Sequence, residues 1–246
     1  MRSKPALRVS LFVICLSFLA ACAGYEPEWP NLWMKERTRI IGRVAGEFKN
    51  RNFELGTPVY IRIFKQSAIA QLWLRDSETG MYMLYKTYPI CAFSGDLGPK
   101  QREGDQQSPE GFYAVGPGQM NPASKYHLAF NIGYPNPFDR YYHRTGSALM
   151  VHGGCKSVGC YAMTDKQIEE IYAIVSLAHD HGQRYVPVHI FPFHMTEENM
   201  LAHASSPWYP FWRNLQQGYL RFEETKIPPV VSVQNGVYVF DQPSGT

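Results

Sequence analysis

Hydrophobic and polar residues alternate along the chain from residue 57 onward. The alternation covers residues 57–64 and 69–74, and a third segment of similar character, 81–88, follows a turn-like Ser-Glu-Thr-Gly sequence. Alternation is typical of a strand with one buried face, and polar segments that contain glycine are typical of turns. These segments therefore predict an antiparallel β-meander.

The remaining pattern predicts more strands and several helices. Thr164 and Gln167 form a capping-box pattern, and hydrophobic residues at helical spacing follow until Gly182, so we expect a helix there. The other expected elements are strands at 126–132 and 185–191, helices at 196–203 and 211–219, a hairpin of 230–233 and 237–240, and long loops at 94–121 (ending in a turn and a strand) and 133–146. One mostly β domain with peripheral helices, an α+β fold, accounts for residues 57–241.

The first 21 residues have the pattern of a targeting segment. Basic residues precede a hydrophobic run that is too short to remain as a membrane-spanning helix. The sequence Leu-Ala-Ala-Cys that ends at Cys22 resembles the lipobox of bacterial lipoproteins, which implies cleavage before Cys22 and lipidation of this residue. Because Ala23 is not the aspartate associated with inner-membrane retention, we expect a periplasmic protein held to the outer membrane by a lipid anchor.

Residues 22–56 are expected to form a tether and one amphipathic helix. Two prolines occur near the start of this segment, and hydrophobic residues then recur at roughly helical spacing. The predicted organisation is therefore a lipoprotein signal peptide at 1–21, a tether and helix at 22–56, and a catalytic domain with C-terminal helices and a hairpin at 57–241.

Composition narrows the classes of partner. The chain is 45% hydrophobic and 18% charged, as a globular protein is. Its formal charge of +3 comes from the three basic residues of the targeting segment, so the rest of the chain is formally neutral. It carries no basic block and no glycine-rich phosphate loop, so we predict no nucleic-acid partner. Nothing in the sequence suggests an oligomer, and we expect a monomer.

Candidate chemistry is concentrated between residues 148 and 165. A strand-like run ends in His152 and Gly153, and a loop of small residues leads to Gly159 and Cys160 before the predicted helix. A histidine can take the proton of a cysteine thiol, and a position near a helix N-terminus could lower the pKa of Cys160. The backbone N–H groups of Gly159 and Cys160 could form an oxyanion hole.

The cysteine count favours one unpaired thiol. With Cys22 assigned to lipid, Cys91, Cys155 and Cys160 remain, and an odd number in an oxidising compartment leaves one unpaired. Cys155 could be a small buried residue, the disulfide partner of Cys91, or a reversible partner of Cys160. A zinc site of His152, Cys155 and Cys160 is a further alternative, although their spacing is not that of a closed zinc motif. We predict no metal.

Two motifs carry a resemblance to a known family. Val151-His152-Gly153 followed by Ser157-x-Gly159-Cys160, with Ser-Pro-Glu-Gly-Phe at 108–112, resembles the L,D-transpeptidase catalytic domain, or YkuD-like family, over about residues 57–190. The sequences at 98–102 and 159–164 resemble a periplasmic branch that includes a murein amidase, an enzyme that detaches a lipoprotein from peptidoglycan.

The resemblance implies a β-sandwich or barrel-like domain and a cofactor-free cysteine enzyme. Cys160 would attack the carbonyl of a diaminopimelate residue in a peptidoglycan stem peptide and form a thioester. His152 would take and return the proton, and the Gly153 carbonyl would orient its imidazole. An amine or water could then accept the acyl group, giving cross-linking or hydrolysis, and a peptidoglycan-linked lipoprotein is a further candidate partner.

Two departures from the family pattern leave alternatives open. Cys160 follows His152 by a step of eight residues, about half the step in many members, so His143 is an alternative base. The short step also favours the alternative of a non-catalytic, peptidoglycan-binding lipoprotein. Tyr161 and Ala162 replace the usual Ile-Arg or Val-Arg, which changes what the site can hold. The weak candidates for substrate contact are Lys100, Arg102 and Tyr161.

Overall fold

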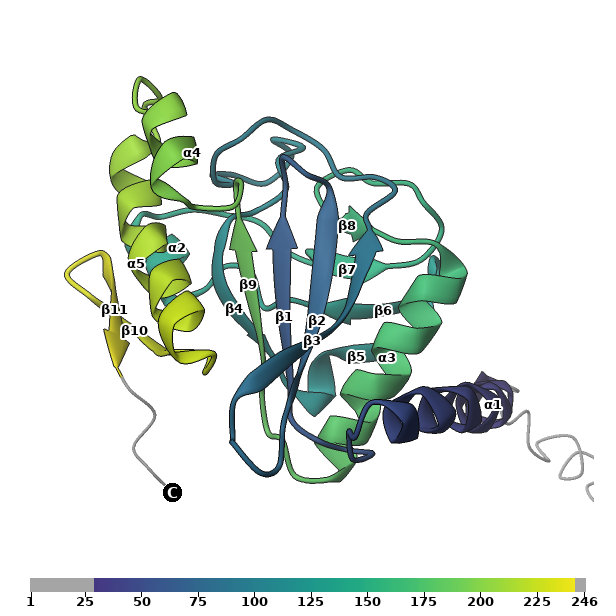
Figure 1. Cartoon of the computed structure of the whole chain (residues 1–246). Coiled ribbons are helices and arrows are strands. Elements are labelled where there is room, and N and C mark those ends of the chain that lie inside the picture. The colour runs from purple at the N-terminus through teal and green to yellow at the C-terminus, as the bar shows by residue number, and fades with distance from the viewer. Residues whose placement is uncertain (1–28, 242–246) are drawn as a thin grey trace, which may run out of the picture.

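The computed structural model describes residues 29–241 and has an α+β fold, which confirms the predicted class (Figure 1). The strands are β1 (Val59–Phe64), β2 (Ile69–Arg75), β3 (Tyr82–Pro89), β4 (Gly111–Val115), β5 (Met120–Ser124), β6 (His127–Asn131), β7 (Met150–His152), β8 (Tyr161–Ala162), β9 (Val186–Phe191), β10 (Val230–Gln234) and β11 (Val237–Asp241). The helices are α1 (Trp29–Asn50), α2 (Pro137–Tyr141), α3 (Asp165–Asp180), α4 (Glu197–Ala202), α5 (Tyr209–Thr225) and a 3-10 turn at Pro117–Gln119.

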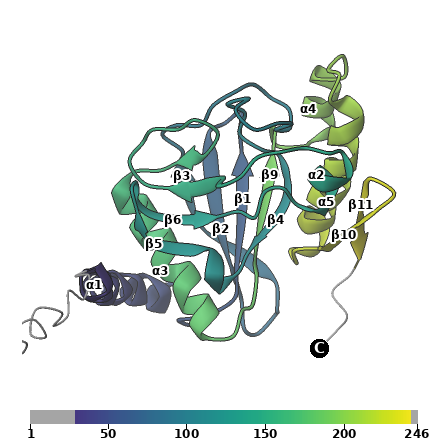
Figure 2. The same ribbon diagram turned by 180° about the vertical axis from the view of Figure 1, so that it is seen from behind.

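The strands form three open sheets. A five-stranded sheet has the order β3-β2-β1-β9-β4, a four-stranded sheet has the order β5-β6-β7-β8, and β10 pairs with β11. Figure 2 shows β5 and β6 crossing the strands of the larger sheet at a steep angle. The predicted meander is confirmed as β1-β2-β3, and β1 is the central strand, buried along its whole length. The sheets do not close into a barrel.

One face of the larger sheet packs against the smaller sheet and α3. Ile61 and Ile63 of β1 share a hydrophobic cluster with Phe130 of β6 and Ile171 of α3. The predicted capping box of α3 is confirmed, because the side chains of Thr164 and Gln167 are both engaged at its first turn. Most of α3 is buried, since it contacts both β1 and β7. This helix therefore fixes the smaller sheet, which carries the candidate site, against the larger one.

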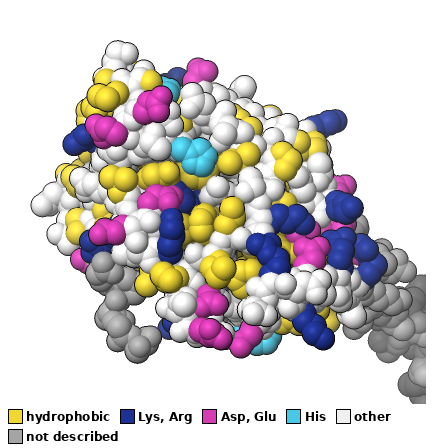
Figure 3. All heavy atoms as spheres, viewed as in Figure 1, with side chains coloured by type: hydrophobic (Ala, Val, Ile, Leu, Met, Phe, Trp, Pro, Cys, Tyr) yellow, Lys and Arg dark blue, Asp and Glu magenta, His cyan; other side chains and the backbone are white. Residues whose placement is uncertain are grey.

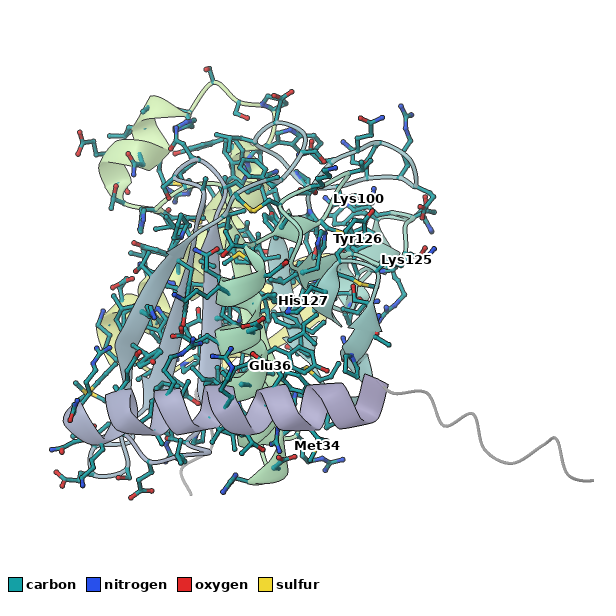
Figure 4. The ribbon with its side chains drawn as sticks, turned by 90° about the vertical axis from the view of Figure 1, so that its right-hand side faces the viewer. Met34, Glu36, Lys100, Lys125, Tyr126 and His127 are labelled. Carbon is teal, nitrogen blue, oxygen red and sulfur yellow. A yellow bond between two sulfur atoms is a disulfide. The ribbon has the colours of Figure 1, made fainter. Side chains whose placement is uncertain are left out.

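The amphipathic helix expected within residues 22–56 is α1, and it packs on the domain. Ile40, Val44 and Phe48 recur every four residues and are buried against the core. Trp33 meets the ring of Tyr172 of α3 edge-on at 4.8 Å, and Figure 4 shows α1 running across one end of α3. The predicted amphipathic helix is thus packed on the domain and is part of the fold.

The opposite face of the larger sheet is covered by α4, α5 and the β10-β11 hairpin, which form a second cluster around Trp212 and Phe222. The Arg62 guanidinium of β1 is buried in this cluster, 2.7 Å from Glu223 and 4.6 Å from the Tyr219 ring. A buried cation needs such partners. Arg62 therefore ties α5 to the central strand.

Some predicted loops contain short elements. Residues 94–121 include β4, as the expected strand, and the first residues of β5, and 133–146 include α2, which begins with Pro137 after the capping residue Asn136. α5 extends beyond the predicted 211–219, because Pro210 fits its first turn and Lys226 ends it in a left-handed conformation. β5 and α2 are too short, and contain proline, so they give no clear hydrophobic period.

Neither Cys22 nor the predicted signal peptide lies within the described residues. Between residues 29 and 241, no helix is long and apolar enough to cross a membrane. Figure 3 shows Lys and Arg side chains gathered over the region of α1, where they lie beside acidic residues of α3. Arg37 pairs with Asp180, and Arg39 lies 3.7 Å from Glu169.

Candidate active site

Parallel pairing of β7 and β8 brings the predicted base and nucleophile to the same face of the smaller sheet. Val151 pairs with Tyr161, and both side chains point into the hydrophobic core. His152 and Cys160 each lie one residue from this pair, so both side chains project from the opposite face. Strand spacing and rise place their Cα atoms roughly 8 Å apart. The seven-residue loop between them therefore leaves the two side chains on one face of neighbouring strands.

His152 is held as a neutral base with a defined tautomer. Its Nδ1 lies 2.6 Å from the Gly153 carbonyl oxygen, and a carbonyl can only accept, so Nδ1 carries the proton. Nε2 then has the lone pair that a general base requires. The ring is 2% exposed and stacks on Tyr126 at 4.6 Å. Tyr126 and the neighbouring His127 lie on the α3 side of the smaller sheet (Figure 4).

Close packing at Gly153 fixes the carbonyl that orients His152. A Cβ atom at Gly153 would lie 2.6 Å from Asp165 Oδ1 and 2.9 Å from the Tyr126 carbonyl oxygen. The Gly153 N–H donates to the carbonyls of Tyr126 and Leu128 at 3.0 and 3.1 Å. Only glycine fits between these groups. Asp165 begins α3, so the helix start sets the position of the imidazole through this residue.

Cys160 is half-buried, and its main chain is tightly held. Its Sγ accepts the Met150 N–H at 3.4 Å and lies 3.7 Å from the Ala148 carbonyl oxygen. Its own carbonyl accepts hydrogen bonds from Ser157 Oγ at 2.6 Å and Ser108 Oγ at 3.3 Å. The nucleophile therefore has a fixed backbone, and Cys160 is the free thiol of the described residues.

Burial keeps both reacting groups neutral at rest. It raises the pKa of the Cys160 thiol above 9.0, and the Met150 N–H and the Lys100 charge oppose this only in part. Burial also lowers the pKa of His152 below 6.5, which the bond to Gly153 opposes. The thiol is thus not ionised in advance. The strand β8 lies between Cys160 and the start of α3 along the chain, and the suggested influence of the helix on the Cys160 pKa stays a prediction.

The two predicted oxyanion donors, the backbone N–H groups of Gly159 and Cys160, differ in their hydrogen bonding. Gly159 adopts a φ of +107°, which strains any residue with a side chain. Its N–H donates to Ser94 Oγ at 2.6 Å, from a loop 65 positions earlier in the chain. This donor is therefore engaged within the protein, and its role in an oxyanion hole stays a prediction. The Cys160 N–H also stays a predicted donor.

The structure resolves the role of Cys155. It forms a disulfide with Cys91, which lies 64 residues earlier in the chain. This bond links the loop between His152 and Cys160 to the segment after β3. Neither a Cys155–Cys160 bond nor a zinc set that includes the Cys155 thiolate is compatible with this pairing. Within residues 29–241, no group of three His, Cys, Asp or Glu side chains is arranged to hold a metal ion.

Two of the three weak substrate candidates are buried. Tyr161 is 1% exposed and donates to the Pro109 carbonyl at 2.7 Å, because its side chain faces the core from β8. Lys100 is 4% exposed, and its ammonium is paired with Asp105. Neither side chain is presented to a substrate in this structure, and both contacts stay predictions. Arg102 is exposed and lines a small cavity of about 370 Å³, so its role stays a prediction.

The alternative base His143 lies in a different environment. It is exposed and follows α2 in a left-handed conformation, with a φ of 53°. His152, by contrast, ends a strand that pairs with the strand of Cys160. The geometry favours His152, and the assignment stays a prediction.

A buried ion pair that supports the loop in contact with Cys160 was not predicted from the sequence. Lys65 and Glu110 are both fully buried, 3.1 Å apart. The Lys65 ammonium donates to the carbonyls of Asp96, Gly98 and Ser108, and so gathers the loop that supports Cys160. The one feature of the sequence that could have indicated this ion pair is Lys65, a lysine directly after the buried strand β1.

Comparison with known proteins agrees with this geometry. Residues 56–190 match the family described as YkuD, the L,D-transpeptidase catalytic domain. A protein of Escherichia coli strain K12 named "Putative L,D-transpeptidase YafK" is 42% identical over 243 residues, which cover 99% of this chain and 92% of that protein. Its counterpart in Escherichia coli O157:H7 matches equally.

Solved structures give weaker similarity. The helical cell shape determining protein Pgp2 of Campylobacter jejuni is 18% identical, with a TM-score of 0.44, over 73% of this chain and 76% of that chain. Bd1075 of Bdellovibrio bacteriovorus is 21% identical, with a TM-score of 0.39, over 68% of this chain and 62% of that chain. The sequence matches decide the family: the chain belongs to the L,D-transpeptidase catalytic domain family.

Proposed function

We propose that this protein is a cell-wall cysteine acyltransferase. Cys160 attacks the carbonyl of a diaminopimelate residue in a peptidoglycan stem peptide and forms a thioester. The observation that supports this proposal most is the placement of an unpaired thiol and a Nδ1-protonated imidazole on one face of β7 and β8. Family membership supports peptidoglycan as the substrate.

The neutral resting pair determines how the reaction begins. His152 Nε2 takes the thiol proton as the Cys160 sulfur attacks, so the sulfur–carbon bond forms while the imidazolium develops. The Gly153 carbonyl, bound to Nδ1–H, stabilises that cation. The imidazolium then gives its proton to the departing amine as the peptide bond breaks. The product is an acyl-enzyme, a neutral imidazole and a released amine.

The same acyl-enzyme serves two outcomes. An amine of another stem peptide would give a cross-link, and water would give hydrolysis, as in an amidase that releases a peptidoglycan-linked lipoprotein. In either case His152 Nε2 takes a proton from the acceptor and returns it to the leaving thiolate. Both outcomes belong to the proposal, and product analysis distinguishes them.

We also propose that the mature protein is a periplasmic lipoprotein anchored through Cys22. The disulfide between Cys91 and Cys155 supports an oxidising compartment, because both residues are exposed. Mass spectrometry of the mature amino terminus tests the anchor. An unmodified terminus at a residue other than Cys22 would contradict it.

Incubation with purified sacculi tests the enzymatic proposal. The parent should release or join diaminopimelate-containing muropeptides, and Cys160→Ala should lose this turnover. Val158→Ala is the matched control, since Val158 lies in the same loop and its side chain is 76% exposed. Equal turnover by the parent and Cys160→Ala would refute the proposal. Binding of sacculi without any product from the parent would instead favour the non-catalytic alternative.

A further inference from the structure

A cavity of about 1020 Å³ lies apart from the reacting groups. Neither Cys160 nor His152 lines it. It is bounded by β4, which is an edge strand of the larger sheet, and by β10, whose one partner among the strands of residues 29–241 is β11. The turn between β2 and β3 and the segment before β10 complete its walls. Two strand edges therefore face one hollow that the proposed reaction does not use.

The charges at this cavity all have one sign. Arg75 and Arg140 line it, and no Asp or Glu does. The Arg75 side chain makes no hydrogen bond or ion pair with any residue between 29 and 241, and the Arg140 side chain donates to the Pro135 carbonyl without a carboxylate partner in that range. Several other cations have carboxylate partners, as Arg62 has in Glu223. Two guanidinium groups without a carboxylate partner among residues 29–241 are thus available to an anionic ligand.

The walls add hydrogen-bonding and apolar surface. Ser232 of β10 lines the cavity, and its Oγ is buried without a hydrogen-bond partner among the described residues. Tyr82 and Tyr185 contribute aromatic faces. The β4 edge is already occupied, because Asn136 Nδ2 donates to its Phe112 carbonyl. A ligand would therefore be held by β10, the arginines and the aromatic walls.

The cavity is close enough to the nucleophile to take another part of the same polymer. Ser108 contacts the Cys160 carbonyl, and Phe112 at the cavity wall is four residues further along. Four residues span no more than about 14 Å between Cα atoms. A peptidoglycan strand carries several carboxylate-bearing stem peptides, so one can be held while another reacts.

We infer that the cavity binds a second, carboxylate-bearing stem peptide, in extended form, of the peptidoglycan strand whose first stem lies at Cys160. This inference rests on the proposed function for the identity of the polymer. It assigns the cavity to anchoring, since a ligand there does not meet the thiol. Arg75 and Arg140 bind the carboxylates, and β10 offers its free edge to the peptide backbone.

Sedimentation with purified sacculi tests the inference directly. In a Cys160→Ala background, which prevents turnover, Arg75→Gln with Arg140→Gln should weaken the apparent affinity for sacculi roughly tenfold, as expected for two partly exposed charge contacts. The matched control is Arg213→Gln with Lys49→Gln, which removes two exposed cations that do not line the cavity. Equal affinity of the two double variants would overturn the inference.

Turnover of a soluble muropeptide with a single stem separates this inference from the proposed function. With Cys160 intact, Arg75→Gln with Arg140→Gln should keep kcat/KM on this substrate within twofold of the parent. An equal loss on the single-stem substrate would overturn the anchoring role. If the parent itself fails to process this substrate, the proposed function fails, while the sacculus binding still reports on the cavity.

Two other occupants are distinguishable. If a variant that ends at Asp241 binds sacculi at least tenfold more tightly than the full chain, residues 242–246 fill the cavity and the inference is wrong. If the parent sediments as a dimer and Arg75→Gln with Arg140→Gln sediments as a monomer, a second copy is the ligand and the inference is again wrong. Unchanged affinity and unchanged sedimentation in these comparisons support the stem peptide.

Discussion

Substitution of Gly153 by alanine perturbs the base without touching either reacting group. The added Cβ would lie 2.6 Å from Asp165 Oδ1 and 2.9 Å from the Tyr126 carbonyl, where ordinary contacts begin at about 3.4 Å. Neither neighbour moves freely, because Asp165 accepts the Gly154 N–H at 2.8 Å and Tyr126 accepts the Gly153 N–H at 3.0 Å. The backbone at residue 153 must therefore shift by roughly half an ångström or more.

Such a shift moves the carbonyl that orients His152. Misplacement of a catalytic group by about 1 Å can cost roughly 100-fold in rate, so we expect Gly153→Ala to lower kcat by roughly 10- to 100-fold. Overpacking of this kind also costs about 1 to 3 kcal/mol in the free energy of unfolding. KM should change little, since Gly153 is buried and its carbonyl is engaged by His152.

The assays are steady-state turnover of a diaminopimelate-containing muropeptide and urea unfolding. Gly46→Ala is the matched control, because Gly46 lies within α1 and a Cβ there meets nothing within 4 Å. This control should gain about 0.5 to 1 kcal/mol in stability and keep the parental kcat. A Gly153→Ala enzyme with kcat within twofold of the parent would refute the role assigned to the Gly153 carbonyl.

Three further predictions follow from the thiol, the disulfide and a buried histidine. Iodoacetamide should alkylate Cys160 at a rate that still rises with pH through 9.0, since burial raises the thiol pKa; a plateau near pH 7 would indicate a preformed thiolate. Replacing Cys91 and Cys155 by serine should lower the free energy of unfolding by up to about 4 kcal/mol, the loop-closure value for their separation of 64 residues, as measured by urea unfolding. Burial lowers the pKa of His189 from 6.5 to about 3, so the unfolded chain takes up this proton first as pH falls below 6.5. Stability should drop by about 4 to 5 kcal/mol toward pH 3, and a His189→Gln variant should lose this part of the dependence.

Strands with one buried face were the most predictable part of the fold. β2 shows this most clearly, because its side chains alternate between buried and partly buried positions, whereas β1 is buried along its whole length and β3 alternates less regularly. By contrast, β8 has two residues, and its pairing with β7 and its bridge to Ala92 come from distant parts of the chain. A strand of two residues is too short to show a hydrophobic periodicity in the sequence. This strand nevertheless places Cys160 beside the strand of His152.

The site was predictable where its chemistry is local in sequence. His152 and Gly153 are adjacent, so the contact between Nδ1 and the carbonyl follows from the motif once the strand ends there. Tyr126, which stacks on the imidazole, comes from a neighbouring strand, and Ser94, which takes the Gly159 N–H, comes from a loop. Such partners depend on the order of strands in the sheet and on loop packing, so the spacing of residues in the sequence does not predict them.

The neutral state of Cys160 also suits the compartment proposed for this protein. A preformed thiolate reacts readily with oxidants, whereas a buried neutral thiol is slower to do so. Cys91 and Cys155 are already joined, so no second thiol of residues 29–241 is free to trap Cys160 in a disulfide. Proton transfer to His152 during attack then confines thiolate character to the moment when a substrate carbonyl is present. The raised pKa, the disulfide and the fixed imidazole are thus parts of one arrangement that keeps the nucleophile reduced without making it inert.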